Sequence, residues 1–191
     1  MKLLCATTNA GKLREFRAAL NDGFDLETLP GEAPEETGLS FEENAIQKAL
    51  YYSKHSAEHL FAEDSGLAVD ALGGAPGIYS ARFAGPDATD ASNNALLLER
   101  MRGVDDRSSR YVCVVALARA GELLHTFRGE VEGAIAEAPR GDGGFGYDPL
   151  FFYPPFGCTF AEAGAEQKML VSHRSRALAA MRAWLAQNAS T

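Results

Sequence analysis

Strand-like apolar runs alternate with helix-like periodic segments along the chain, and this alternation limits the possible folds more than any other feature. Residues 2–7 are predicted as a buried strand, and apolar side chains at helical spacing predict a helix over residues 11–20. A second short strand is expected over residues 24–29, followed by a loop over residues 30–38. Such mixed alternation is typical of an α/β protein in which helices pack on a long twisted sheet.

The clearest helix is predicted over residues 40–58, because Ser40 and Glu43 match a capping box. Leu60 to Ala62 are predicted as the end of a buried strand that enters a turn at residues 63–67. The remaining expected elements are a strand up to residue 69, a helix over 87–101, a hairpin of strands 111–118 and 122–134, a glycine-rich loop over 139–148, a short apolar run over 149–153 and a helix over 172–187 with Ser172 as its N-cap.

The length and the charge of the chain limit its organisation and its partners. We expect a single domain over residues 1–191, because no repeat, low-complexity linker or domain-scale change in composition divides the chain. The net charge of −8 argues against a nucleic-acid polymer as partner, since polymer binding is largely neutralisation of phosphates by a basic face. A single nucleotide needs only a local cluster of cations and N–H groups, so it stays possible.

Three widely separated cysteines, Cys5, Cys113 and Cys158, favour a reducing cytoplasm over a disulfide framework or a zinc site. Cys5 and Cys113 lie in apolar runs, so we expect buried thiols there. No stretch approaches the ~18 apolar residues that span a bilayer, and the start of the chain is too short for a signal peptide. We therefore expect no membrane partner.

Two adjacent carboxylates, Glu63 and Asp64, follow the predicted strand end. Carboxylates at a strand end are costly to desolvate, so they usually serve a metal, a proton transfer or a cap. The alternative is a surface turn in which Asp64 bonds its own backbone. Four further polar clusters favour the functional interpretation, because they have the composition of a phosphate and base site.

The first of these clusters is the sequence Thr-Thr-Asn-Ala-Gly-Lys at residues 7–12, between the first strand and the first helix. Hydroxyls, an amide and a lysine at a helix N-terminus suit phosphate, because the first turn offers N–H groups and the positive end of the dipole. Thr8 or Asn9 as a simple helix cap is the alternative, and it is compatible with phosphate binding. The second cluster joins Glu35 and Glu36 to Glu43, Asn44 and Lys48, of which Asn44 and Lys48 share a helix face. The alternative is a solvated helix face, which we expect for Glu42 and Glu43.

The third and fourth clusters suit a base. The loop over residues 141–149 places Phe145 and Tyr147 among glycines, which permits a close approach to a flat ligand, although such an aromatic is often a core side chain. Lys168 and the segment Ser172-His173-Arg174-Ser175-Arg176 supply donors for a base edge or a phosphate, with a surface histidine as the alternative.

Taken in order, six motifs closely resemble the inosine triphosphate pyrophosphatase family, also called Ham1-like. They are Thr8-Asn9-Ala10-Gly11-Lys12, Phe41-Glu42-Glu43-Asn44-Ala45, Asp64-Ser65-Gly66-Leu67, the run from Gly73 to Arg82, Gly144-Phe145-Gly146-Tyr147-Asp148-Pro149 and Ser172-His173-Arg174. These motifs extend over nearly the whole chain, and the sequence resembles the bacterial members of the family.

The resemblance implies an elongated mixed twisted sheet with helices packed on it, in two lobes around a central cleft. It implies an Mg²⁺-dependent homodimer that hydrolyses ITP, dITP and XTP to the monophosphate and pyrophosphate and so cleanses the nucleotide pool. It also implies the site residues. Asp64 and Lys48 would be catalytic, with Asp64 as proton acceptor, and Glu36 and Asp64 would hold Mg²⁺. The substrate would contact Thr7, Thr8, Asn9, Ala10, Gly11, Lys12, Ser65, Phe145, Gly146, Tyr147, Asp148, Lys168, His173 and Arg174.

One departure from the family pattern concerns Glu63, since the family usually has two aspartates before Ser-Gly. Donors from His173 or Arg174 would favour a 6-oxo purine over adenine, because a mispaired donor costs more than a lost contact. Two alternatives are a Maf-like pyrophosphatase acting on pyrimidine or modified nucleotides, and a non-catalytic nucleotide-binding regulator. The regulator would be expected to lack a carboxylate or a lysine of the site, and this chain has Lys12, Glu36, Lys48 and Asp64.

Overall fold

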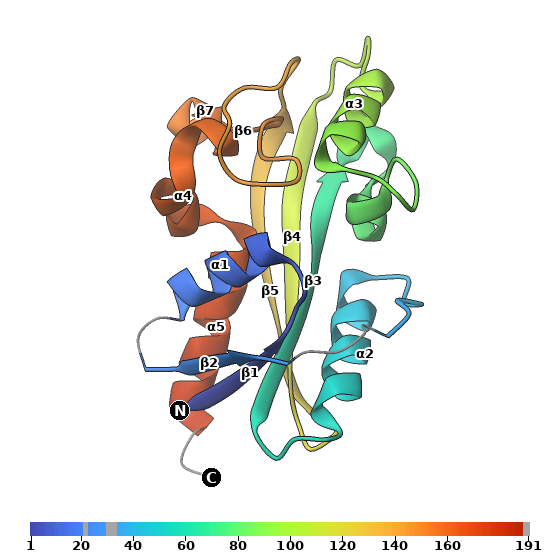
Figure 1. Ribbon diagram of the computed structural model, residues 1–191. Helices are drawn as coiled ribbons and strands as arrows, with labels where there is room; N and C mark the ends of the chain where they lie inside the picture. The colour runs from blue at the N-terminus through green and yellow to red at the C-terminus, as the bar shows by residue number, and fades with distance from the viewer. Residues whose placement is uncertain (21–22, 30–33, 189–191) are drawn as a thin grey trace. The chain divides into compact units, whose positions relative to one another are not determined.

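The computed structural model describes residues 1–20, 23–29 and 34–188. Within these ranges the strands form one mixed sheet in the order β2-β1-β3-β4-β5-β6-β7 (Figure 1). Strand β1 pairs in parallel with β2 and β3, whereas β6 pairs antiparallel with β5 and β7. The strands are β1 (Lys2–Ala6), β2 (Asp25–Thr28), β3 (His59–Val69), β4 (Ser108–Arg119), β5 (Glu122–Ile135), β6 (Phe151–Tyr153) and β7 (Cys158–Thr159).

The helices are α1 (Ala10–Ala19), α2 (Phe41–Ser53), α3 (Asp90–Arg100), α4 (Phe160–Val171) and α5 (His173–Asn188), with short 3₁₀ helices η1 (Asp70–Leu72), η2 (Gly77–Arg82) and η3 (Pro154–Phe156). This mixed α/β architecture confirms the predicted fold class. In the part of the chain that the structure describes, every helix is too short or too polar to cross a membrane.

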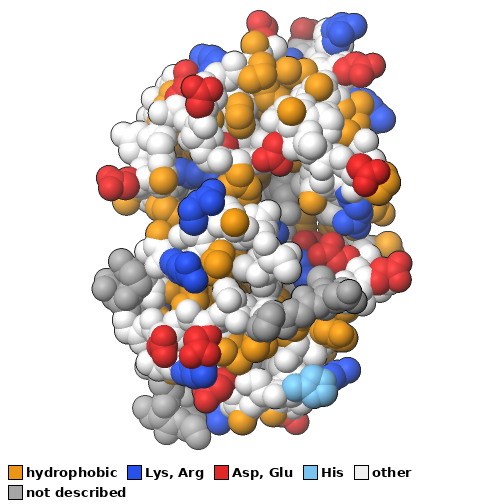
Figure 2. All heavy atoms as spheres, in the orientation of Figure 1, with side chains coloured by type: hydrophobic (Ala, Val, Ile, Leu, Met, Phe, Trp, Pro, Cys, Tyr) orange, Lys and Arg blue, Asp and Glu red, His pale blue; other side chains and the backbone are white. Residues whose placement is uncertain are grey.

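The chain divides into two compact units, and strands β3, β4 and β5 contribute residues to both. Unit 1 comprises Met1–Asp64, Cys113–Gly129 and His173–Thr191, and unit 2 comprises Ser65–Val112 and Glu130–Ser172. On the face of the molecule drawn in Figure 2, Lys and Arg side chains are interspersed with Asp and Glu side chains.

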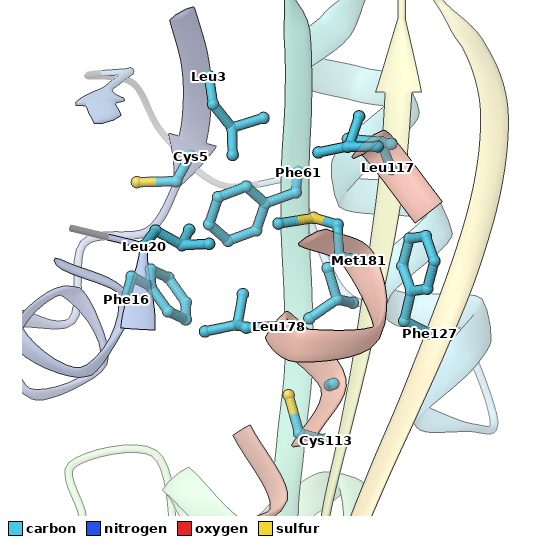
Figure 3. Close-up of a cluster of buried hydrophobic side chains, with 13 residues drawn as sticks. Leu3, Cys5, Phe16, Leu20, Phe61, Cys113, Leu117, Phe127, Leu178 and Met181 are labelled. Atoms are coloured by element: carbon cyan, nitrogen blue, oxygen red, sulfur yellow. The ribbon is translucent and has the colours of Figure 1, made fainter. Parts of the chain in front are cut away.

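The core of unit 1 joins β1, β3, α1 and α5. Figure 3 shows Leu3, Phe16, Phe61, Leu178 and Met181 gathered there, and all are fully buried. The rings of Phe16 and Phe61 meet edge to face with centroids 5.1 Å apart. Burial of each side chain contributes about 1.5–3 kcal/mol, so this core holds α1 against the adjacent strands.

The core of unit 2 is aromatic. Tyr111 of β4, Phe151 of β6 and Phe160 of α4 are buried together, with ring centroids 4.5 Å apart for Tyr111 and Phe151 and 4.9 Å apart for Phe151 and Phe160. Leu97 of α3 belongs to the same cluster. This packing holds the strands and the helix that precede and follow the glycine-rich loop.

The turn predicted at residues 63–67 is wrong, because β3 runs without interruption from His59 to Val69. Glu63 and Asp64 are buried within the strand, and both carboxylates have cationic partners. Gly66 fits there because a side chain at this position would collide with Ser80. Paired carboxylates therefore allow the strand to continue where isolated ones would have ended it.

Several element boundaries also differ from the prediction. Helix α2 ends at Ser53, and its capping box is only half formed: Ser40 Oγ accepts from Glu43 N at 3.1 Å, whereas the Glu43 carboxylate accepts from Leu39 N. Helix α4 was not predicted, because Gly164, with φ 79°, interrupts its periodicity. Ser172 is the C-cap of α4 and directly precedes α5.

Other predictions are confirmed. Ala120 (φ 51°) and Gly121 (φ 83°) form the turn between β4 and β5, where two positive φ angles match a hairpin turn. Cys5 and Cys113 are buried and free, as expected. The predicted loop over residues 30–38 lies partly outside the described residues, which resume at residue 34.

Candidate functional site

The N-terminus of α1 carries the first predicted cluster. Asn9 caps the helix, with its Oδ1 accepting from Lys12 N at 3.0 Å, and Thr7 Oγ1 accepts from Asn9 N at 3.2 Å. Thr8, Asn9 and Ala10 are exposed, whereas Gly11 is buried. The cap is therefore Asn9 and not Thr8, and the loop is organised by its own hydrogen bonds. A helix N-terminus organised in this way can bind an anion.

Glu63 of β3 contacts the first turn of α1 through the side chain of Lys12. Its Oε1 is 2.5 Å from Lys12 Nζ, and its Oε2 is 3.4 Å from Cys113 Sγ and 3.8 Å from Arg174 Nε. Burial by itself would raise the pKa of Glu63, but the charges of Lys12, Arg174 and Lys48 outweigh it and hold that pKa well below its ordinary value. These cations therefore favour the ionised form of Glu63.

Asp64, the next residue, reaches the second cluster. Its Oδ1 is 3.1 Å from Lys48 Nζ, and its Oδ2 accepts from Asn44 Nδ2 at 3.2 Å. Glu36 Oε1 lies 2.6 Å from the same Lys48 Nζ. Asn44 Oδ1 accepts in turn from Gly38 N at 2.9 Å, which ties the segment after Glu36 to α2.

The cluster around Lys48 has balanced electrostatics. Burial lowers the pKa of Lys48, but Asp64, Glu63 and Glu36 together raise it above its ordinary value. Burial raises the pKa of Asp64 despite the opposing charge of Lys48. Lys48 is therefore the charged partner of two carboxylates, and Asp64 is the more easily protonated of the two acids in β3.

The donor set of this cluster fits a hard divalent cation. Glu36 and Asp64 both contact the ammonium group of Lys48, so their carboxylate oxygens lie beside one cationic position. Oxygen is the ligand atom that a hard divalent cation prefers. Among the described residues, no group of three or more His, Cys, Asp or Glu side chains is arranged to hold a metal ion. A cation held by two carboxylates would take its remaining ligands from water and substrate, as is common for Mg²⁺.

Unit 2 contains a second charged cluster, centred on Asp148. This carboxylate is 1% exposed and accepts from Lys168 Nζ at 2.6 Å, Phe145 N at 3.0 Å and Tyr111 OH at 3.2 Å. The Lys168 ammonium lies 4.7 Å from the centroid of the Phe145 ring. The glycine-rich loop is therefore folded around a buried ion pair, and Gly144 (φ 74°) is required where a side chain would collide with the Asp148 carboxylate.

The same loop is held from α3 and η2. Gly146 N donates to Asp90 Oδ2 at 2.6 Å, and Asn94 Nδ2 donates to Gly146 O at 2.9 Å. Tyr147 is buried and its hydroxyl donates to Ser80 O at 2.8 Å. The run from Gly73 to Arg82 thus supports the loop through Ser80, whose Oγ also accepts from Leu67 N.

The structure distributes the predicted site residues between the units. Unit 1 holds residues 7–12, Glu36, Lys48, Asp64, His173 and Arg174, whereas unit 2 holds Ser65, residues 145–148 and Lys168. His173 is buried, so the alternative of a surface histidine is wrong. Glu42 and Glu43 are exposed, as the solvated-face interpretation predicted.

Several residues of these clusters were missed by the sequence analysis, namely Glu15, Asp90, Asn94 and Tyr111. Only Glu15 carried a usable signal, because it lies three residues after Lys12 and therefore on the same helix face. The others contact the glycine-rich loop across 37 to 56 residues of sequence.

Comparison with known proteins gives consistent matches over nearly the whole chain. The model of the Ham1 family matches residues 3–184. A dITP/XTP pyrophosphatase from Exiguobacterium sp. is 50% identical over 184 residues, which cover 93% of each chain, and one from Thermus thermophilus is 50% identical over 187 residues, covering 95% of this chain and 90% of the relative.

Solved structures agree with these matches. The Ham1 protein of Staphylococcus aureus superimposes with a TM-score of 0.88 at 37% identity and covers 98% of this chain and 100% of that one. The HAM1 protein of Coxiella burnetii superimposes with a TM-score of 0.88 at 38% identity and covers 98% of this chain and 99% of that one.

Proposed function

The chain belongs to the Ham1 family, and we propose that it hydrolyses the non-canonical purine nucleotides dITP, XTP and ITP to the monophosphate and pyrophosphate. The observation that carries this proposal is about 50% identity over some nine tenths of relatives named dITP/XTP pyrophosphatase. The buried carboxylates and lysines of unit 1 support it, because a regulator would not need to maintain them. The Maf-like alternative is not favoured.

The proposed reaction adds water across the anhydride between the α- and β-phosphates. The water loses a proton to Asp64 and its oxygen joins phosphorus, while the bond between the phosphates breaks and pyrophosphate leaves. Burial raises the pKa of Asp64, which makes it a stronger base than an exposed aspartate. Lys48 and Asn44 hold both oxygens of the Asp64 carboxylate and so orient it.

The cations of unit 1 are assigned to the phosphates. Hydrolysis increases the negative charge on the leaving pyrophosphate, and Lys12 and Lys48 supply fixed positive charge against it. The N–H groups at the start of α1, next to Thr7, Thr8 and Asn9, add the positive end of the helix dipole. Most of the catalytic effect then comes from positioning and electrostatics.

Mg²⁺ is the proposed cofactor, held by Glu36 and Asp64. When bound, it would supply positive charge against the phosphate oxygens. Lys48 Nζ contacts the same two carboxylates, so its positive charge reduces the repulsion between them. The two oxygen ligands favour Mg²⁺ over zinc.

The base and sugar are assigned to Phe145, Gly146, Tyr147, Asp148, Lys168, His173 and Arg174, and Ser65 is assigned to a contact with the substrate. The Phe145 ring is a flat apolar surface beside the Lys168 ammonium, and such a pair can stack on a purine and donate to its 6-oxo group. Adenine presents a donor at that position and would be rejected. A homodimer in the cytoplasm and a single domain over residues 1–191 complete the proposal.

Pyrophosphate release tests this function. The purified protein should release pyrophosphate from ITP, dITP and XTP with a kcat/KM well above that for ATP, CTP and UTP at one Mg²⁺ concentration. Asp64→Asn should lose this activity, whereas the control variant Asp87→Asn, at an exposed aspartate, should keep it. Preference for a pyrimidine triphosphate would overturn the proposal in favour of the Maf-like class, and binding without turnover would indicate a regulator.

A further inference from the structure

Helix α3 lies outside the residues that the proposed function assigns to the substrate, yet two of its side chains hold the glycine-rich loop. We propose that Asp90 and Asn94 are positioning residues for base selection, because together they fix both backbone groups of Gly146. The inference rests on the proposed function, which assigns Gly146 and the residues beside it to the base and sugar. It adds α3 to the determinants of base selectivity and places neither side chain in contact with the base.

Both polar backbone groups of Gly146 are bound by α3. Its N–H donates to Asp90 Oδ2 at 2.6 Å, and its carbonyl accepts from Asn94 Nδ2 at 2.9 Å. These groups belong to two successive peptides, so one bond orients the peptide shared with Phe145 and the other orients the peptide shared with Tyr147. In a trans peptide the C=O and N–H groups point in opposite directions, so the Asn94 bond turns the Tyr147 N–H away from α3.

The start of α3 does not need the Asp90 carboxylate for its own cap. Thr89 is the N-cap: its Oγ1 accepts from Ser92 N at 3.2 Å, and Ser92 Oγ accepts from Thr89 N at 2.9 Å. This reciprocal pair is a capping box, which leaves the adjacent carboxylate available to the loop. Asp90 uses it to bind an amide 56 residues away in sequence.

Asn94 carries a cost that packing alone does not explain. It is 9% exposed, and its Oδ1 is buried with no hydrogen-bond partner in the part of the chain that the structure describes. A buried polar atom without a partner is destabilising, and an apolar side chain of similar size would avoid that cost. The bond from the other end of the same amide to Gly146 O is what the asparagine supplies in return.

The frame around the loop is closed through η2. Asn93 Nδ2 donates to Ser80 O at 3.3 Å and to Ala81 O at 3.2 Å. Asn93 Oδ1 accepts from Ala84 N at 2.8 Å. Ser80 O also accepts from Tyr147 OH at 2.8 Å. Helix α3, η2 and the loop are therefore joined pairwise, so a shift of the loop breaks at least one of these contacts.

Amide hydrogen exchange of Gly146, followed by NMR on isotope-labelled protein, reports the first contact directly. We expect Asp90→Ala to raise the exchange rate of this amide about tenfold, the scale of one lost hydrogen bond to a charged group. Asp90→Asn should exchange much as wild type does, because its amide oxygen can still accept. Glu99→Ala, at an exposed glutamate near the other end of α3, should leave the rate unchanged. An unchanged rate in a folded Asp90→Ala protein would overturn the inference.

Base selection is measured on the same variants by titration with inosine monophosphate and adenosine monophosphate, which have the same sugar and phosphate. Wild type should bind the inosine nucleotide more tightly. Asp90→Ala and Asn94→Ala should lower the ratio of the two affinities about tenfold, and the kcat/KM ratio of ITP over ATP should fall in parallel. Asp90→Asn should recover most of the ratio. A purely structural role would weaken both nucleotides by one factor and leave the ratio unchanged.

Two results of the titrations contradict the inference. One is a wild-type ratio in a folded Asp90→Ala protein whose Gly146 amide exchanges faster, because the contact would then serve the fold alone. The other is a wild type that binds both monophosphates equally. Asp90 is exposed, so its variant decides the question even where Asn94→Ala does not fold. Failure of the proposed function is separate: it appears as no pyrophosphate release from any triphosphate, whereas exchange and the titrations need no turnover.

Discussion

Replacing Lys168 with methionine should destabilise the protein through the carboxylate that it leaves behind. The side chain of Asp148 is 1% exposed and that of Lys168 is 5% exposed, and the two groups form an ion pair of 2.6 Å. Without the ammonium group, the buried carboxylate would keep the hydrogen bonds from Tyr111 OH and Phe145 N but would lose its 2.6 Å ion pair. Removing one partner of a buried ion pair costs about 3–5 kcal/mol, so we expect a loss of that size.

Urea denaturation followed by circular dichroism measures this loss, with the fluorescence of Trp184 in unit 1 as a second probe. A loss of about 3–5 kcal/mol corresponds to a Tm lower by roughly 6–20 °C for a chain of this size. Lys54→Met, at an exposed lysine, is the matched control and should stay within about 0.5 kcal/mol of wild type.

The double variant Lys168→Met with Asp148→Asn separates charge from packing. Because it leaves no uncompensated charge, it should recover most of the stability that Lys168→Met loses. A folded Lys168→Met protein within about 0.5 kcal/mol of wild type would refute the reasoning. So would a double variant that is no more stable than the single one.

Three further predictions concern catalysis, metal and pH. Asp64→Asn should lower kcat on ITP at least ~10³-fold while circular dichroism stays unchanged, and near-normal turnover would exclude Asp64 as the base. Exhaustive dialysis against EDTA should abolish pyrophosphate release and added Mg²⁺ should restore it, whereas full activity after dialysis would remove the metal from the scheme. Burial raises the pKa of the Cys5 thiol to about 11. The neutral thiol therefore contributes fully to the free energy of unfolding below its unfolded-state pKa near 9, and this stabilisation is lost as the pH rises towards 11. Urea denaturation between pH 8 and 11 should show this loss, up to about 2–3 kcal/mol, and a Cys5→Ala variant with the same pH slope would contradict it.

Local patterns predicted much of the fold. The helix periodicity of α1 and α5 and the Ala120-Gly121 turn depend on residues close in sequence, and these elements are present. The spacing of Asn44 and Lys48 also placed both on one helix face, where both reach Asp64. The predicted turn at residues 63–67 was wrong because Glu63 and Asp64 are neutralised by side chains remote in sequence, which no local pattern contains.

The partners of the buried charges were the least predictable part of the site. Arg174 and Glu15 are separated by 159 residues, and their contact depends on the packing of α5 against α1. Helix α4 was missed because Gly164 interrupts its pattern, although Lys168 within it was identified as a site residue. Sequence motifs thus selected the candidate site residues, whereas their electrostatic partners required the tertiary structure.

The products of ITP hydrolysis test the central proposal most directly. Phosphorus NMR of the reaction of the wild-type protein with ITP and Mg²⁺ distinguishes cleavage between the α- and β-phosphates from loss of the terminal phosphate. The account predicts inosine monophosphate and pyrophosphate in equal amounts, with no diphosphate at any time. Inosine diphosphate accumulating with orthophosphate would contradict it.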